Sequence, residues 1–150
     1  MNDATPGPAT TGIFRLIYRS RDRIPMDQRK VELGDLFSKA RSRNKEKDIT
    51  GALLIADDWF VQALEGEEVA VRTLFAHIEK DPRHDSVSLL DAKTVDDRVF
   101  SRWAMAKVAH DGEPDIPLLA NTKGITAAAS RGTTPEQESI LQIMRDATRS

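Results

Sequence analysis

Apolar and polar residues alternate at the start of the chain and then recur at helical spacing. Residues 13–20 are rich in β-formers, and alternate positions share a face, which predicts a first strand. One face carries Phe14, Leu16 and Tyr18, and the other carries Ile13, Arg15 and Ile17. Residues 21–28 contain Pro25 and are expected to form a loop.

A stripe of apolar residues predicts a first helix over about residues 30–43. The stripe recurs at positions i, i+3, i+4 and i+7, and consists of Leu33, Leu36, Phe37 and Ala40. Gly34 lies within this segment and weakens the helix by about 1 kcal/mol relative to Ala. The polar residues 44–48 are expected to end the helix.

The next segments predict a hairpin, a second helix and two more strands. Apolar residues 49–56 and 59–64 flank a short turn, so these two strands should pair. Residues 65–68 include three glutamates, which suit the positive end of a helix dipole, so this segment is expected to begin the second helix. That helix should end at Asp81-Pro82. Its stripe is Val71, Leu74, Phe75 and Ile78. Further strands are predicted over residues 87–92 and 103–108.

The resulting order β-α-β-β-α-β-β indicates an α+β fold. Its first six elements match the ferredoxin-like βαββαβ arrangement, an antiparallel-rich sheet with two helices on one face, and the fifth strand is an addition. Residues 12–109 are expected to form the domain, after a flexible arm at residues 1–11. Residues 110–150 should form a linker, with a short helix near 116–120 and a C-terminal helix over about 134–148.

The C-terminal helix is marked by a capping pattern. Thr134 suits the N-cap, Pro135 suits the first helical position, and Gln137 completes a capping box. The apolar face of this helix should pack either on the chain's own sheet or on a partner.

Composition narrows the functional classes. The chain has 150 residues, a formal net charge of −2 and no cysteine. One domain is expected, without disulfides, thiolate catalysis or cysteine-rich zinc sites. Balanced charge gives no reason to expect binding to nucleic acid or membrane. With no signal peptide and no apolar run long enough to span a bilayer, a cytoplasmic location is expected.

Few residues point to a specific chemistry. No phosphate-binding glycine loop or G-x-S-x-G elbow is present, and His77, His84 and His110 lack metal-ligand spacing, so no metal is expected. The anomaly is Gln62, which shares a strand face with Phe60 and Leu64 where a buried amide would need partners. Tyr18, the only tyrosine, and Asn44 are expected near the same sheet. Taken singly, each has an ordinary explanation: a surface Gln, a core Tyr, a helix-capping Asn.

Taken together with their neighbours, these residues resemble the BLUF family of flavin-binding blue-light sensors. The resemblance covers about residues 13–108. The matching stretches are Leu16-Ile17-Tyr18-Arg19-Ser20, Arg43-Asn44, Ile49-Thr50-Gly51-Ala52-Leu53-Leu54, Phe60-Val61-Gln62-Ala63-Leu64-Glu65-Gly66, His77-Ile78, Asp81-Pro82-Arg83-His84 and Phe100-Ser101-Arg102-Trp103-Ala104-Met105.

The resemblance implies a role for each matching residue. Tyr18 would donate an electron and a proton, and Gln62 would bridge it to the flavin. Asn44 would hold the polar edge of the ring. Apolar walls would come from Leu36 and Ile78, the segment Asp81, Arg83 and His84 would lie on the ribityl-phosphate side, and Trp103 and Met105 would relay the signal. Ala40 and His77 stand where some family members carry serine and arginine.

The function implied by the resemblance is non-covalent flavin binding with a Tyr–Gln hydrogen-bond switch. The cofactor would be FAD, with FMN or riboflavin as alternatives. No output enzyme domain is expected, so light would alter a homo-oligomer (a dimer or larger) or binding to a separate effector. Two alternatives remain open: a small ferredoxin-like hydrolase resembling acylphosphatase, with Arg19 and Asn44 in its site, or a flavin-free interaction module.

Overall fold

The computed structural model of the chain describes residues 12–56, 58–109, 115–117, 119–121, 124–126 and 135–148. The helices are η1 (Met26–Gln28, a 3₁₀ turn), α2 (Arg29–Glu46), α3 (Glu68–Ile78) and α4 (Pro135–Asp146). The main strands are β1 (Ile13–Asp22), β2 (Thr50–Ala56), β3 (Trp59–Gly66), β4 (His84–Val95) and β5 (Ala106–Ala109). Short strands follow as β6 (Ile116–Pro117), β7 (Leu119–Asn121) and β8 (Gly124–Thr126).

One sheet organises the described part of the chain, with strand order β4-β1-β3-β2-β5-β6. Strand β1 lies antiparallel between β4 and β3, and β3 lies antiparallel to β2. This core is the ferredoxin-like arrangement, so the predicted α+β fold is confirmed. The added strand β5 runs parallel to β2, and the short β6 runs parallel to β5.

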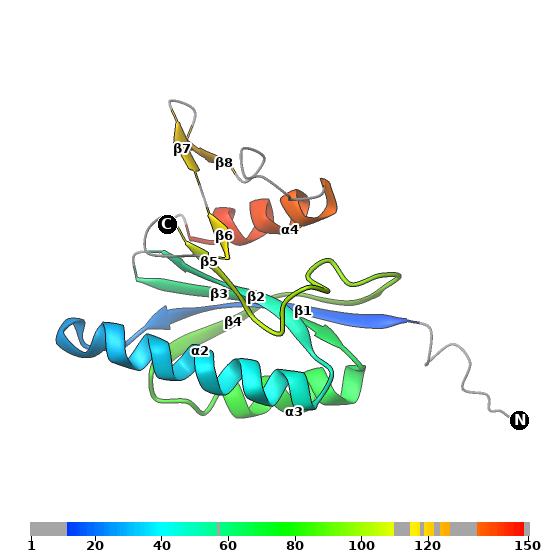
Figure 1. The fold of residues 1–150 in the computed structure, drawn as a ribbon, viewed down its shortest axis with the longest axis horizontal. Helices are drawn as coiled ribbons and strands as arrows, with labels where there is room; N and C mark the ends of the chain where they lie inside the picture. Colours follow the sequence, from blue (N-terminus) through cyan, green and yellow to red (C-terminus); the bar gives the residue numbers. More distant parts are fainter. Residues whose placement is uncertain are drawn as a thin grey trace, which may run out of the picture.

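Helices cover both faces of the central strands of the sheet, whereas the edge strand β4 is largely exposed. Helices α2 and α3 cover one face and α4 lies across the other (Figure 1). The first core contains Leu16, Tyr18 and Leu64 among the residues packed under α2 and α3. The second contains Ile17 and Val61, which pack against α4. Alternation along β1 therefore places Tyr18 and Ile17 in different cores, as the sequence predicts.

Helix α4 packs on the chain's own sheet. Its buried residues Ile140, Leu141 and Met144 join the second core. The amide of Gln137 donates from Nε2 to the Val99 carbonyl at 2.8 Å, which fastens α4 to the chain before β5. Of the two placements left open for this helix, the structure shows the one on its own sheet.

Several predicted boundaries are wrong at element ends. Helix α2 continues past residue 43 to Glu46, so Asn44 lies inside it. Strand β1 extends to Asp22, and residues 26–28 form η1 within the predicted loop. Strand β4 begins at His84 and ends at Val95, because pairing with β1 extends it beyond the apolar run at 87–92.

Three further predictions are corrected by sheet pairing. Residues 65 and 66 do not begin a helix, because Glu65 and Gly66 pair with Arg15 and Phe14 and extend β3. The fifth strand starts at Ala106 rather than at residue 103, because its register with β2 begins at Ala106. Where a short helix was expected near residues 116–120, the described residues 116, 117, 119 and 120 belong to strands β6 and β7.

Some predictions concern residues outside the described ranges. These are the arm at residues 1–11, His110 and the N-cap at Thr134. Among the helices of the described residues, none combines the length and apolar character needed to cross a membrane.

Two glycines provide a matched test of packing. A Cβ built on Gly51 would lie 2.1 Å from the carbonyl oxygen of Ala63, whereas one built on Gly34 would have no neighbour within 4 Å. Gly51→Ala should lower the free energy of unfolding by about 2 kcal/mol or more, because backbone must move. Gly34→Ala, within α2, should raise it by about 0.5–1 kcal/mol. Urea unfolding measures both, and a mild effect at Gly51 would contradict the close packing of β2 on β3.

Candidate functional site

The centre of the candidate site is a cross-strand pair on the face covered by α2 and α3. Tyr18 on β1 lies directly opposite Gln62 on β3, with 3% and 4% of their surfaces exposed. The Tyr18 hydroxyl donates to Gln62 Oε1. Burial raises the pKa of Tyr18 far above its ordinary value, and the positive charge of Arg43 partly offsets the rise. The phenol therefore holds its proton against the amide oxygen.

The other end of the Gln62 amide contacts a sulfur atom. Gln62 Nε2 lies 3.3 Å from Met105 Sδ, and Met105 is 1% exposed. A thioether accepts a weak hydrogen bond and has no proton to donate. The two ends of this amide therefore have chemically different neighbours.

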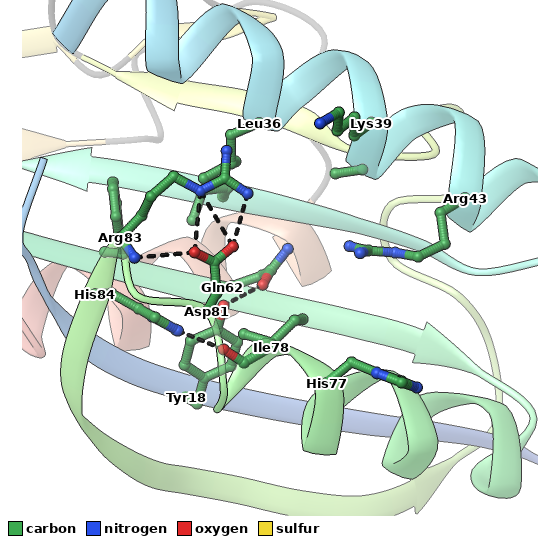
Figure 2. Close-up of a pocket in the computed structure, with 13 residues that line it drawn as sticks. Tyr18, Leu36, Lys39, Arg43, Gln62, His77, Ile78, Asp81, Arg83 and His84 are labelled. Carbon is green, nitrogen blue, oxygen red and sulfur yellow. Dashed lines mark hydrogen bonds and ion pairs between the residues drawn. The ribbon is translucent and has the colours of Figure 1, made fainter. Parts of the chain in front are cut away.

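A pocket opens beside this pair, between α2, α3 and the sheet (Figure 2). Its cavity volume is about 110 Å³, which is below the range of about 300–1,000 Å³ usual for small-molecule sites, so a bound ring would have to displace lining side chains. The lining comes from four parts of the fold. They are the sheet (Tyr18, Leu53, Phe60, Gln62), α2 (Leu36, Lys39, Ala40, Arg43), the end of α3 (His77, Ile78) and the turn into β4 (Asp81, Arg83, His84).

Asn44 follows Arg43 on α2 but is not among the residues that line the pocket. It is fully buried, and its Nδ2 donates to the Ala104 carbonyl at 2.8 Å. Its Oδ1 accepts no hydrogen bond from the described residues. A buried acceptor without a donor costs about 1–3 kcal/mol, so this oxygen is a site at which an N–H donor of a ligand would be stabilising.

His84 is fastened to the protein at both ring nitrogens. Nε2 contacts the Ile78 carbonyl, and Nδ1 lies 2.7 Å from Ser20 Oγ. A carbonyl only accepts, so Nε2 carries the proton; in the neutral ring Nδ1 then accepts from the Ser20 hydroxyl. The ring also stands edge-on to Tyr18, with centroids 6.2 Å apart. His84 therefore ties the end of α3 to β1 and supports the Tyr18 ring.

Arg83 is engaged by acidic side chains. Its Nε and Nη2 donate to the Asp81 carboxylate at 2.7–3.1 Å, as Figure 2 shows. Asp35 and Glu32 on α2 lie 3.4 and 3.9 Å from its Nη1. The hydrogen bonds from Arg83 hold the pKa of Asp81 below its usual range, and those same bonds raise the pKa of Arg83. The segment is thus a structural ion cluster that joins the turn before β4 to α2.

Two basic residues of the pocket come from a charged segment of α2 for which the sequence left two interpretations open, a solvated face and phosphate binding. Lys39 and Arg43 line the pocket, and in Figure 2 both project from α2. The signal for their place in the pocket lies in the spacing, since Leu36, Lys39, Ala40 and Arg43 repeat at i, i+3, i+4 and i+7 and so share one face of the helix. Desolvation lowers the pKa of Arg43 from its usual value, which accords with its partial burial.

Trp103 and Met105 pack against different cores, although both line one surface depression beside α2. Met105 belongs to the core under α2 and α3, where it meets Gln62. Trp103 is half-buried and packs against the other core, the one that contains α4. Arg102 stacks on its ring with its guanidinium carbon 5.0 Å from the centroid. The segment before β5 thus contacts both cores, and of these two residues Met105 contacts Gln62.

Glu65 is a buried residue that sequence reasoning assigned to a helix. It is fully buried at the end of β3, and its carboxylate accepts from the backbone N–H groups of Val99 and Phe100 and from the Thr50 hydroxyl. The carboxylate therefore fixes the chain that leads to Met105. No local pattern marks this role, because its donors lie about 35 residues away in the sequence.

The two residues invoked for a hydrolase do not share a site. Arg19 donates from Nη1 to the Ala147 carbonyl at 3.0 Å, on the face covered by α4. Asn44 lies in α2, on the other face. The acylphosphatase-like reading is therefore wrong in its geometry, because an anion could not reach both residues.

Comparison with known proteins gives a family match. The model of the BLUF family, described as sensors of blue light using FAD, matches residues 13–106. Photoactivated adenylate cyclase subunit beta of Euglena gracilis is 33% identical over 120 residues, which are 77% of this chain and 14% of that protein. The blue light- and temperature-regulated antirepressor BluF of Escherichia coli (strain K12) is 37% identical over 90 residues, 60% of this chain and 22% of that protein. The chain spans less than a quarter of the length of these two relatives.

Solved structures give the same picture. The dark-state structure of BlrB, a BLUF protein, matches with a TM-score of 0.63 and 33% identity over 67% of this chain and 74% of that chain. Klebsiella pneumoniae BlrP1, solved with manganese and cyclic di-GMP, matches with a TM-score of 0.68 and 31% identity over 91% of this chain and 34% of that one.

The Asp81–Arg83 cluster predicts a pH dependence. A carboxylate whose pKa is lowered by folding adds stability above its unfolded pKa of about 3.9, and loses it as pH falls through the native value. The difference in free energy of unfolding between the parent and Asp81→Asn should be about 1 kcal/mol or less at neutral pH and should shrink below about pH 4. Urea unfolding between pH 3 and 7, with exposed Asp96→Asn as control, measures it. A difference that stays constant down to pH 3 would contradict the assignment.

Proposed function

The chain belongs to the BLUF family of blue-light sensors that use flavin, and from that premise we propose that the pocket beside Tyr18 and Gln62 holds the ring of FAD. The observation that carries the proposal is the buried Tyr18–Gln62 hydrogen bond at the wall of a pocket between α2, α3 and the sheet. The Tyr18–Gln62 pair would then be the photoactive element, and the change in its hydrogen bonds would be the signal.

The residues present fit a flat, polar-edged heterocycle. Leu36 on α2 and Ile78 at the end of α3 offer apolar contacts from two sides of the pocket. The unpartnered Oδ1 of Asn44 offers an acceptor to a ring N–H, and the amide of Gln62 offers both bonding types. A flavin ring supplies such a donor together with carbonyl and ring-nitrogen acceptors.

When bound, the flavin absorbs blue light and can withdraw an electron from a nearby donor. Tyr18 is the donor proposed here, because it is the only tyrosine in the chain and lines the pocket. Loss of an electron makes a phenol a strong acid, and the existing hydrogen bond directs its proton to Gln62 Oε1. The nearby positive charge of Arg43 favours that loss of the proton.

When the electron and the proton return to Tyr18, the Gln62 amide can remain rotated and so record the event. In the present orientation Oε1 accepts from Tyr18 and Nε2 faces Met105 Sδ. After rotation Nε2 would face the Tyr18 oxygen, and Oε1 would face a sulfur that has no proton to give. Met105 Sδ would then lose the weak hydrogen bond that it accepts from Gln62 Nε2. The rotation changes bonding without changing net charge, which suits a buried site.

The basic residues at the pocket are proposed to bind the phosphates of FAD. Lys39 and Arg43 line the pocket; the Lys39 side chain is 72% exposed, and its one ion pair among the described residues is a solvent-exposed contact of 3.3 Å with Asp35. Arg83 is less available, because its donors are directed at Asp81, Asp35 and Glu32. The family resemblance pointed to Arg83 and His84 on this side, but the contacts favour Lys39 and Arg43 as the charges that select FAD over riboflavin.

The light signal is proposed to pass from Gln62 to α4 through the segment before β5. Met105 meets the switch, and Glu65 fixes Val99 and Phe100 in the same segment. Gln137 then links Val99 to α4. A changed position of Met105 would thus reach α4 and alter the chain's self-association or its binding to an effector. Some relatives are named as a cyclase or an antirepressor, so the partner's chemistry varies among relatives.

The switch pair gives a direct spectroscopic test. The purified protein should be yellow, and blue light should shift its absorption reversibly to the red. Gln62→Leu and Tyr18→Phe should each keep flavin bound yet abolish the shift, because the amide or the proton donor is gone. Exposed Gln28→Leu should photocycle like the parent. A normal photocycle in either switch variant would refute the mechanism, and a protein that refuses added flavin would leave the interaction-module alternative.

Flavin choice gives a second test. Combining Lys39→Ala with Arg43→Ala should weaken FAD binding by about tenfold or more, since each hydrogen bond to a charged group contributes about 1.5–3 kcal/mol. Riboflavin, which lacks phosphate, should lose less than about threefold. Calorimetry with both flavins measures the difference, and exposed Lys80→Ala is the control. Equal losses for the two flavins would contradict the assignment of these residues to phosphate.

A further inference from the structure

A groove runs along α2 on the side of the helix turned away from the flavin pocket. The pocket takes residues 36, 39, 40 and 43, whereas the groove takes Gly34, Ser38, Arg41 and Lys45, which the helical repeat places on the other side. Two depressions form it and meet at Gly34 and Arg41, which line both. Its opposite wall is the segment Arg102–Met105 together with Lys107 and Asp115. We refer to it as the α2–β5 groove.

The charge of the α2–β5 groove is strongly one-sided. Among its described lining residues, six are basic and one, Asp115, is acidic. The basic residues are Arg29, Lys30, Arg41, Lys45, Arg102 and Lys107. The whole chain carries a net charge of −2, so this excess is local. Asp22 and Asp115 pair with Arg29 and Arg41, but no ion pair engages the side chains of the three lysines within the described residues.

Apolar atoms accompany these charges. The half-buried Leu33 and Trp103 supply apolar surface in its two parts, above Phe37 and Met105, which are 5% and 1% exposed. The missing side chain at Gly34 leaves open space on the helix surface. Mixed apolar and basic lining of this kind suits a peptide with both acidic and apolar side chains. A nucleic acid would bring many phosphates to a chain of net negative charge, which is unfavourable beyond the groove.

We infer that the α2–β5 groove is the docking site for an acidic, partly apolar segment of a partner protein. One wall of this groove contains Met105, which also contacts Gln62 of the proposed switch. Arg41 Nε donates to the Met105 carbonyl at 3.1 Å, while Met105 Sδ meets Gln62 on the inside. The neighbouring Ala104 carbonyl accepts from Asn44. A light-dependent affinity follows if the proposed function holds, because the rearranged amide would shift this wall.

Fluorescence anisotropy with a labelled peptide of Glu, Leu and Ala residues tests the docking site on the full chain. The peptide should bind and should weaken as salt rises. Lys45→Glu with Arg102→Glu should weaken it about tenfold or more, whereas Lys80→Glu with Lys93→Glu, exposed elsewhere, should change it less than about twofold. Circular dichroism confirms that each variant is folded. No binding, equal weakening by both pairs, or tighter binding of a single-stranded DNA of equal charge would overturn the inference.

Absorption spectra of the same samples separate this inference from the proposed function. A normal red shift without peptide binding would overturn the docking site and leave the photoreceptor mechanism intact. Selective peptide binding by a colourless protein would support docking and refute the photoreceptor mechanism. Equal affinity in light and dark, with a normal red shift, would overturn the light dependence.

Discussion

The rest of the site depends on one cross-strand hydrogen bond between a phenol and a carboxamide. Antiparallel pairing of β1 with β3 sets Tyr18 opposite Gln62, and the alternation of each strand turns both side chains to the same buried face. A shift of one residue in this register would send one partner to the α4 side and leave the other without a bond. The hydrophobic cores on both faces therefore protect the chemistry as well as the fold, because they fix the register.

Much of this arrangement follows from the sequence pattern. Alternation in β1 and β3 predicted which side chains share a face, and the order of elements predicted the ferredoxin-like sheet. The ends of the elements were less predictable, because pairing partners set them. Glu65 is the clearest case: its acidic neighbours suggest a helix start, yet distant backbone donors at Val99 and Phe100 satisfy its carboxylate in a strand.

In the pocket too, sequence periodicity predicted some residues, whereas contacts between distant segments could not be predicted. Leu36 and Ile78 could be placed as apolar walls from helical periodicity and family resemblance. That Arg83 would be surrounded by carboxylates, two of them from α2, could not be predicted because those contacts join segments about 50 residues apart. Trp103 and Met105 are two residues apart, yet they enter different cores. Both residues lie before β5, outside the sheet, so strand alternation does not predict which way their side chains point.

The burial of the Gln62 amide affects how long a rearranged hydrogen-bond pattern lasts. Only 4% of its surface is exposed, and its neighbours are a phenol and a thioether. Few groups can replace a lost partner at so buried an amide, so intermediate orientations leave polar atoms unsatisfied at a cost of about 1–3 kcal/mol each. That cost forms a barrier between two discrete arrangements. The lifetime of the rearranged state would then depend on how tightly Phe60, Met105 and their neighbours pack. A substitution that changes only the volume of this core would therefore change that lifetime.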